Sequence, residues 1–131
     1  MTYDVVALAR QTPDPKAIVA GMLAAGEQLR VREAANGAII QLCDNDGKPL
    51  VSLETPILIQ VPGEIDRLLG PGHSQQLGLP VWWIEARAPS GRPEAQALAR
   101  RFATEVADRL DGIVWPPATS SGDADTPGRD Q

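Results

Sequence analysis

Two turn sequences lie close together near the middle of this chain, and they constrain its fold more than any other feature. Asn36-Gly37 is typical of a tight β-hairpin, because both turn residues must accept positive φ angles. The run "NDGK", at 45–48, predicts a second turn. Since apolar-rich segments flank both turns, we expect three antiparallel strands at about 29–35, 38–43 and 49–54. The third strand can continue through "PILIQ", although Pro56 favours an edge position or a break there.

The segments before these strands predict one strand followed by one helix. "YDVVALAR" has the apolar character of a strand, and "TPDPKAIVAGMLAAGEQ" has that of a helix. Asp14 is the expected N-cap, Pro15 suits the first helical position, and Gly26 is the expected stop. The predicted buried face has apolar residues at helical spacing: Ile18, Met22 and Ala25, widened by Val19 and Leu23.

The segments after the three strands predict two more helices. "VPGEIDRLLG" indicates a short helix with Ile65, Leu68 and Leu69 facing inward, and "VWWIEARA" indicates a strand. "RPEAQALARRFATEVADRLDG" has the clearest helical period of the chain, and "IVW" can add a short edge strand. The residues expected to form the buried face of this long helix are Leu98, Phe102, Val106 and Leu110, with Ala95 and Ala99 alongside.

The predicted order is β-α-β-β-β-α-β-α, with a possible short last strand. A chain of 131 residues fits one domain. Tight turns between successive strands favour a mainly antiparallel sheet, so we expect an α+β two-layer sandwich with the helices on one face. The domain spans 1–115, and the polar, Pro- and Gly-rich segment 116–131 is predicted to be a disordered tail.

The charge of the chain restricts its partners. The 17 acidic and 12 basic residues give a net charge of −5, which disfavours nucleic acid and an anionic membrane surface. An acidic protein can instead bind a basic one, because complementary fields speed encounter. The N-terminus lacks the pattern of a secretory signal and no apolar run approaches the length of a membrane span, so the expected location is the cytoplasm.

Catalytic and metal signatures are weak in this sequence. "DNDG", at 44–47, fits a turn better than a calcium loop, because the ligand spacing that follows does not match. His73 is the only histidine, and Cys43 has acidic neighbours rather than the electropositive setting that a catalytic thiol needs. Four acids remain as candidates for a carboxylate pair: Glu54, Glu64, Asp66 and Glu85. We therefore predict no catalytic, cofactor-binding or metal-ligating residues, and no cofactor.

Adjacent tryptophans in the strand "VWWIEARA" give the best functional lead. Side chains alternate between the faces of a strand, so Trp82 belongs with the apolar set that contains Ile84. Trp83 then shares the other face with Glu85 and Arg87. It can pack on a neighbouring strand, stack on an arginine, lie under the loop 70–80, or form an interaction patch, since Trp and Arg are frequent hot-spot residues.

Three other features bear on that patch. Arg30 and Arg32 alternate along one strand, so both point to one face, either to bind an anion or to pair with acids on neighbouring strands. Trp115 can extend the patch or cap the core. The Ala-rich helical segment "AIVAGMLAAG" can pack against the other Ala-rich helix or form a homodimer.

Three classes of function remain open. The favoured class is a non-catalytic cytosolic interaction module, such as a small acidic bacterial immunity or regulatory protein, whose partner is another protein. Its predicted contact residues are Trp83, Arg30, Arg32, Glu85, Arg87 and Trp115. The second class is a small-molecule-binding domain with a cleft near the loop 70–80. The third, and least favoured, is an enzyme that uses His73 or a carboxylate pair.

Overall fold

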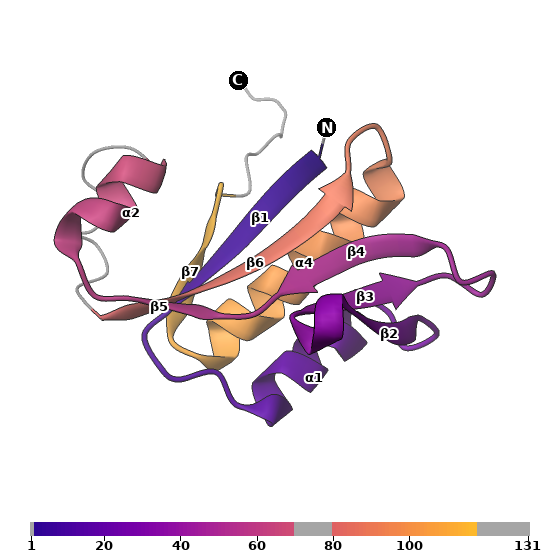
Figure 1. Ribbon diagram of the computed structural model, residues 1–131, viewed down its shortest axis with the longest axis horizontal. Coiled ribbons are helices and arrows are strands. Elements are labelled where there is room, and N and C mark those ends of the chain that lie inside the picture. The colour runs from indigo at the N-terminus through magenta and orange to yellow at the C-terminus, as the bar shows by residue number, and fades with distance from the viewer. Residues whose placement is uncertain (1, 70–79, 118–131) are drawn as a thin grey trace, which may run out of the picture.

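The computed structural model of the chain describes residues 2–69 and 80–117. Its strands and helices follow the predicted order, including the short last strand, and Ile57–Ile59 forms one further short strand (Figure 1). In chain order they are β1 (Thr2–Ala9), α1 (Pro15–Ala25), β2 (Arg30–Ala34), the 3-10 helix η1 (Ala35–Gly37), β3 (Ile39–Cys43), β4 (Pro49–Glu54), β5 (Ile57–Ile59), α2 (Pro62–Leu69), β6 (Val81–Pro89), α4 (Pro93–Arg109) and β7 (Gly112–Trp115). The predicted disordered tail lies outside the described residues, apart from Pro116 and Pro117.

All strands belong to one antiparallel sheet in the order β2-β3-β4-β6-β1-β7, with β5 pairing β6 as well. Two successive strands share one side of β6. In β4, Ser52 is paired with Arg87 of β6. In β5, Ile57 is paired with Trp83, which lies nearer the start of β6. The strand is interrupted between β4 and β5 at Pro56, as expected because proline has no amide hydrogen to donate to a neighbouring strand. The α+β, antiparallel prediction is confirmed, including a short last strand.

The two turns form where the sequence predicts them, but the first is wider than two residues. Ala34 pairs with Ile39, so four residues form the loop, and Ala35 and Asn36 have φ angles of 52° and 58°. The second turn depends on Asp44, whose carboxylate accepts the backbone N–H groups of Asp46 and Lys48 at 2.9 Å each. That carboxylate therefore has a local structural role of the kind that makes Asp frequent in turns.

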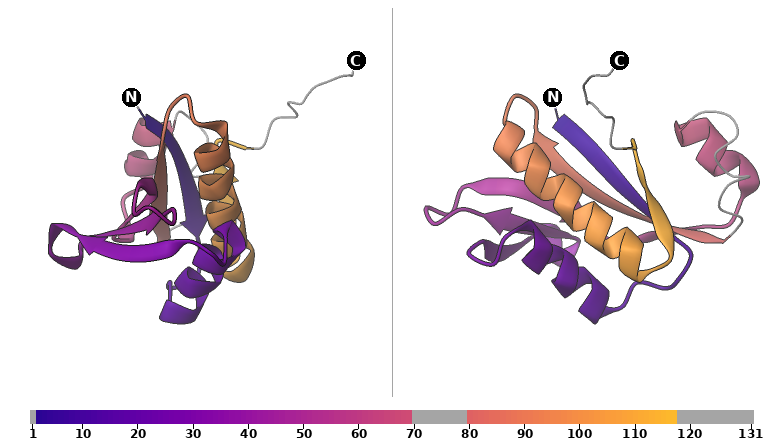
Figure 2. Two further views of the ribbon diagram at one scale, coloured as in Figure 1. Left: turned by 90° about the vertical axis from the view of Figure 1, so that its right-hand side faces the viewer. Right: turned by 180° about the vertical axis from the view of Figure 1, so that it is seen from behind.

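One face of the sheet is covered by α1 and α4, which lie side by side across it (Figure 2, right). Asp14 caps α1 by accepting the N–H of Ala17 at 2.8 Å. A Cβ atom at Gly21 would come within 2.7 Å of the Val106 side chain, so this glycine lets the helices approach closely. The small residues of α1 thus serve packing within the chain. The predicted widening of the buried stripe is wrong, because Val19 and Leu23 are exposed.

The third helix, α2, packs against the opposite face of the sheet. Val6 and Leu8 alternate with the residues of β1 that face α1 and α4, and they form a second cluster with Ile65 of α2. The expectation that the helices share one face therefore holds for α1 and α4 but not for α2 (Figure 2, left). Ile65 is fully buried as predicted, whereas Leu68 is 45% exposed, contrary to expectation, because it lies outside the cluster that Ile65 forms with the sheet. Within residues 2–69 and 80–117, no helix has the length and apolar character needed to cross a bilayer.

Candidate functional site

Strand β6 presents two different sets of side chains on its two faces, as its alternation predicts. Ile84 and Ala86 belong to the core under α1 and α4, and Trp82 packs against that core. Val81 and Trp83 belong to the cluster on the opposite face. This opposite face, which α1 and α4 do not cover, is the candidate functional surface.

Trp83 is half-buried and packs across strands. Its neighbours in the sheet register are Leu8 on one side and Ile57 on the other. Its indole N–H donates to the Oε1 atom of Glu85 at 3.1 Å, so the polar edge of the ring is satisfied. Of the packing alternatives that the sequence leaves open, cross-strand packing is the one observed. Most of the loop 70–80, under which Trp83 was alternatively placed, lies outside the described residues.

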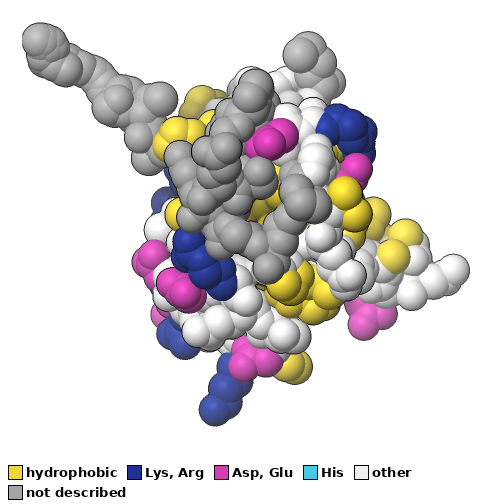
Figure 3. Space-filling model, turned by 90° about the vertical axis from the view of Figure 1, so that its left-hand side faces the viewer, with side chains coloured by type: hydrophobic (Ala, Val, Ile, Leu, Met, Phe, Trp, Pro, Cys, Tyr) yellow, Lys and Arg dark blue, Asp and Glu magenta, His cyan; other side chains and the backbone are white. Residues whose placement is uncertain are grey.

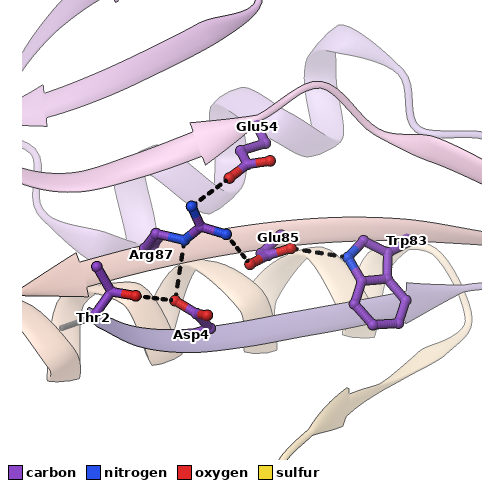
Figure 4. A network of polar contacts seen from close by, with 6 residues as sticks. All are labelled: Thr2, Asp4, Glu54, Trp83, Glu85 and Arg87. Carbon is purple, nitrogen blue, oxygen red and sulfur yellow. Dashed lines mark hydrogen bonds and ion pairs between the residues drawn. The ribbon is translucent and has the colours of Figure 1, made fainter. Parts of the chain in front are cut away.

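Arg87 is the centre of an acidic network on the same face (Figure 4). Its guanidinium lies 2.8 Å from Glu85, 3.1 Å from Glu54 and 3.1 Å from Asp4, measured between nitrogen and carboxylate oxygen. The hydrogen bond to Glu85, with the charges of the three acids, raises the pKa of Arg87 above its usual value. Because three carboxylates share one guanidinium, the network has a formal charge of −2.

The structure brings some of the predicted contact residues together and separates others. Trp115 pairs with Val6 in the register and packs against the same cluster as Trp83. Arg30 and Arg32 lie on β2, and both β3 and β4 separate that strand from β6. Arg32 donates to Gln41 at 2.8 Å. The predicted patch is therefore two separate regions, one around Trp83 and one at the β2 edge.

A groove lies beside Trp83, between β5 and α2, with a volume of about 540 Å³. Its walls include large apolar side chains with high exposed fractions: Ile57 at 56%, Leu58 at 36%, Val61 at 61% and Leu68 at 45%. In Figure 3, which views this end of the molecule, hydrophobic side chains lie among acidic and basic ones. We call this feature the β5 groove.

Charged side chains stand at the rim of the β5 groove. Arg67 pairs with Glu64 at 2.8 Å, and this hydrogen bond raises the pKa of Arg67. Glu85 also lines the groove, and through Arg87 it connects the groove to the acidic network. The groove therefore combines apolar walls with three charged side chains, two acidic and one basic.

Sequence reasoning missed most of the groove. It placed Leu68 inside and gave no role to Ile57, Leu58 or Val61. One signal was available: "ILI" follows Pro56 and contains no charged residue, although an edge position was expected there. Two of the three partners of Arg87 were not predictable, because Asp4 and Glu54 meet it only through strand pairing.

The remaining candidates for chemistry do not converge in the described part of the chain. Cys43 is buried at the end of β3. Asp44 is engaged by its own turn. His73, the histidine of the enzyme alternative, lies outside the described residues. Glu54 and Glu85 each pair with the guanidinium of Arg87, which lies between them.

Comparisons with known proteins give no functional information, so a function has to be inferred from the geometry and charge of this site. No protein-family model matches the chain, and searches of curated proteins and of solved structures found no significant similarity.

Proposed function

We propose that this protein is a non-catalytic interaction module that binds another protein through the β5 groove. The observation that carries the proposal is the concentration of exposed apolar surface beside Trp83. Of the seven large apolar side chains that are exposed in the described part, four line this groove. Contiguous apolar surface of this kind, rimmed by polar residues, is typical of interaction sites.

The composition of the groove agrees with that of a binding hot spot. Trp83 forms part of the wall, and Trp is among the residues that contribute most to interface energy. Its hydrogen bond to Glu85 holds the ring before any partner arrives. A pre-ordered aromatic side chain loses little conformational entropy on binding, which favours affinity.

The charges around the groove favour a basic partner. The network centred on Arg87 has an excess of two carboxylates, and the whole chain has a net charge of −5. Complementary potentials steer association and disfavour partners of the same sign. An acidic or nucleic-acid partner is therefore a poor fit for this face.

A second candidate is a small-molecule site, which the volume of the groove favours. About 540 Å³ lies within the usual range of ligand pockets, roughly 300–1,000 Å³. The strong exposure of Ile57 and Val61 argues against it, because a small ligand is usually enclosed by such side chains. The protein-binding proposal is therefore preferred.

The test is affinity capture from the source cells with matched variants. Ile57 and Val31 both lie on edge strands and are 56% and 58% exposed, so lysine at either position is equally tolerable for the fold. We expect wild type and Val31→Lys to retain a common partner, and Ile57→Lys and Trp83→Ala to lose it. Circular dichroism and thermal melting check that each variant is folded.

Two results would contradict the proposal. One is a partner set that Ile57→Lys and Val31→Lys retain equally, which would place binding elsewhere. The other is a saturable change in tryptophan fluorescence with a small metabolite, absent in Trp83→Phe, together with no captured protein. That second result would favour the ligand-binding alternative.

A further inference from the structure

We infer that the partner adds an extended segment as a further strand on the free edge of β5, with apolar side chains beside Ile57 and a Lys or Arg near Glu54. This inference rests on the proposed function and specifies the chemistry of the partner. It follows from three features of β5: one edge of its backbone is unpaired in the described part of the chain, its side chains are apolar and partly exposed, and negative charge lies near its first residue.

In the described part of the chain, the backbone of β5 is paired along one edge and unpaired along the other. β5 pairs with β6 on one side, and no strand among residues 2–69 and 80–117 pairs with its other side. The described turn and loop hydrogen bonds do not include Ile57, Leu58 or Ile59 either. An extended strand directs alternate N–H and C=O groups outward, so this edge offers a template for another strand.

The side chains of β5 distinguish its edge from that of β2, at the end of the sheet. β2 has the sequence RVREA, and charged residues on an edge strand oppose pairing with another chain. β5 has the sequence ILI, with no charge and with two strongly exposed side chains. Natural proteins normally protect such an edge, so an unprotected apolar edge beside a groove indicates a docking strand.

The register places an added strand over the groove. Ile57 and Trp83 are direct neighbours across β5 and β6, and both line the groove. A strand added outside β5 continues this row, because side chains of paired strands lie directly opposite one another. Alternate residues of the added segment therefore point into the groove, which requires an apolar residue at every second position.

The charge at the beginning of β5 selects the sign of the segment. Glu54 ends β4, only Thr55 and Pro56 separate it from β5, and it belongs to the network with a formal charge of −2. A basic residue of the added strand is attracted to this end. A second copy of this chain brings an identical network and a net charge of −5, so the charges favour a basic foreign segment over self-association.

The experiment selects random peptides, displayed on phage, for binding to the whole protein. A peptide length of about nine residues suffices for a strand and its flanks. We expect enriched peptides with alternating apolar residues, at least one Lys or Arg, and no internal proline. Synthetic copies should bind Ile57→Lys about tenfold or more weakly than wild type, which is a change of roughly 1.4 kcal/mol. They should bind Val31→Lys as tightly as wild type.

Two further experiments, one with modified peptides and one with protein variants, test strand addition and charge separately. A peptide N-methylated at one set of alternate positions should lose binding, while methylation of the other set should be tolerated, because only one set of N–H groups faces β5. Glu54→Gln should weaken binding of the basic peptide more than Glu33→Gln, which removes the same charge from β2. Peptide binding should also slow hydrogen exchange of the β5 amides.

Several outcomes would overturn the inference. These are failure to enrich peptides, enrichment of acidic or helix-forming peptides, tolerance of both methylation patterns, or self-association of the protein through β5. If a cellular partner is nevertheless captured in an Ile57-dependent way, the proposed interaction function stands and only strand addition is wrong.

Discussion

The face of the sheet under α1 and α4 differs from the opposite face in the residues that the same strands contribute. On β1, Ala7 and Ala9 face the two helices, whereas Val6 and Leu8 face α2. Small side chains on the strands let the two helices approach the sheet closely. On the opposite face, within residues 2–69 and 80–117, the short helix α2 covers part of the sheet, and the remainder carries the β5 groove and the network of Arg87.

Because of this difference, we expect the residues that stabilise the fold and the residues that bind a partner to lie mainly on opposite faces of the sheet. The helix-covered face has one large cluster of buried residues, in which Phe102 is fully buried. The opposite face has a small core of its own, and beside it apolar groups that remain exposed. Substitutions on the first face should therefore change mainly the free energy of unfolding, and substitutions around the groove should change mainly binding.

The largest expected effect is that of Phe102→Ala on the helix-covered face. Removing this fully buried ring should lower the free energy of unfolding by about 3–5 kcal/mol, because a cavity forms that the sheet and α1 cannot fill. Urea unfolding monitored by circular dichroism measures the change. A loss no larger than that of a surface substitution would contradict the description of this face as the main core.

Ile65→Ala tests the smaller core on the opposite face. We expect a loss of about 2–3 kcal/mol in the free energy of unfolding, because Ile65 joins α2 to Val6 and Leu8. Hydrogen exchange should accelerate in α2 more than in β1. Leu68→Ala is the matched control, and its smaller effect reflects the exposure of Leu68. Equal acceleration in α2 and β1 would show that the two faces unfold as one unit.

Gly21→Ala tests the close approach of α1 and α4. The added methyl group would collide with Val106 and Phe102, so the free energy of unfolding should fall by about 1–3 kcal/mol despite the better helix propensity of alanine. Gly63→Ala makes the same change in α2, where the added Cβ meets no packed neighbour among the described residues, and should be neutral or slightly stabilising. The same sign for both variants would contradict the packing argument.

Arg87→Gln tests the acidic network with a smaller effect on stability. The Arg87 side chain is 40% exposed, so we expect a loss of about 1 kcal/mol or less. The loss should shrink at high salt, since screening weakens repulsion among the three remaining carboxylates. Urea unfolding at low and high ionic strength measures this dependence. A loss that is independent of salt would show that Arg87 acts through packing instead.

The smallest expected effect concerns Glu94, near the start of α4. Its hydrogen bond with Arg92, 2.7 Å long, lowers the pKa of Glu94 below its usual value. Since the folded pKa is lowered, the stabilisation is present above the ordinary carboxyl pKa and is lost as pH falls through the lowered value. Titration followed by NMR should show the low pKa, and Arg92→Gln should raise it. An unchanged pKa in that variant would contradict the assigned cause.

Local patterns in the sequence predicted most of the elements, because each depends on residues close together in the chain. Asp14 and Gly26 mark the ends of α1, Pro56 interrupts the strand before β5, and Asp44 forms its own turn. The alternation of β6 correctly assigned Trp82 and Trp83 to opposite faces. Turn chemistry and side-chain period do not depend on the rest of the fold, so they can be interpreted directly from sequence.

The candidate site was predicted only in part. Trp83, Glu85 and Arg87 were expected on one face and lie there, while Arg30 and Arg32 share that face but stand at the β2 edge. Sequence gives the face of a residue from its alternation, yet the distance across the face depends on strand order. Strand order is decided by long-range pairing, which no local pattern encodes.

The sequence by itself determined the α+β composition, the antiparallel hairpins, the acidic charge and the faces of the strands. Only the tertiary structure decided that β4 and β5 share one side of β6, that α2 covers the face opposite α1 and α4, and that Asp4 and Glu54 meet at Arg87. The physical reason is that periodicity and turn chemistry act over a few residues. Pairing and burial instead bring together residues that are far apart in the chain, and their free energy depends on the whole fold.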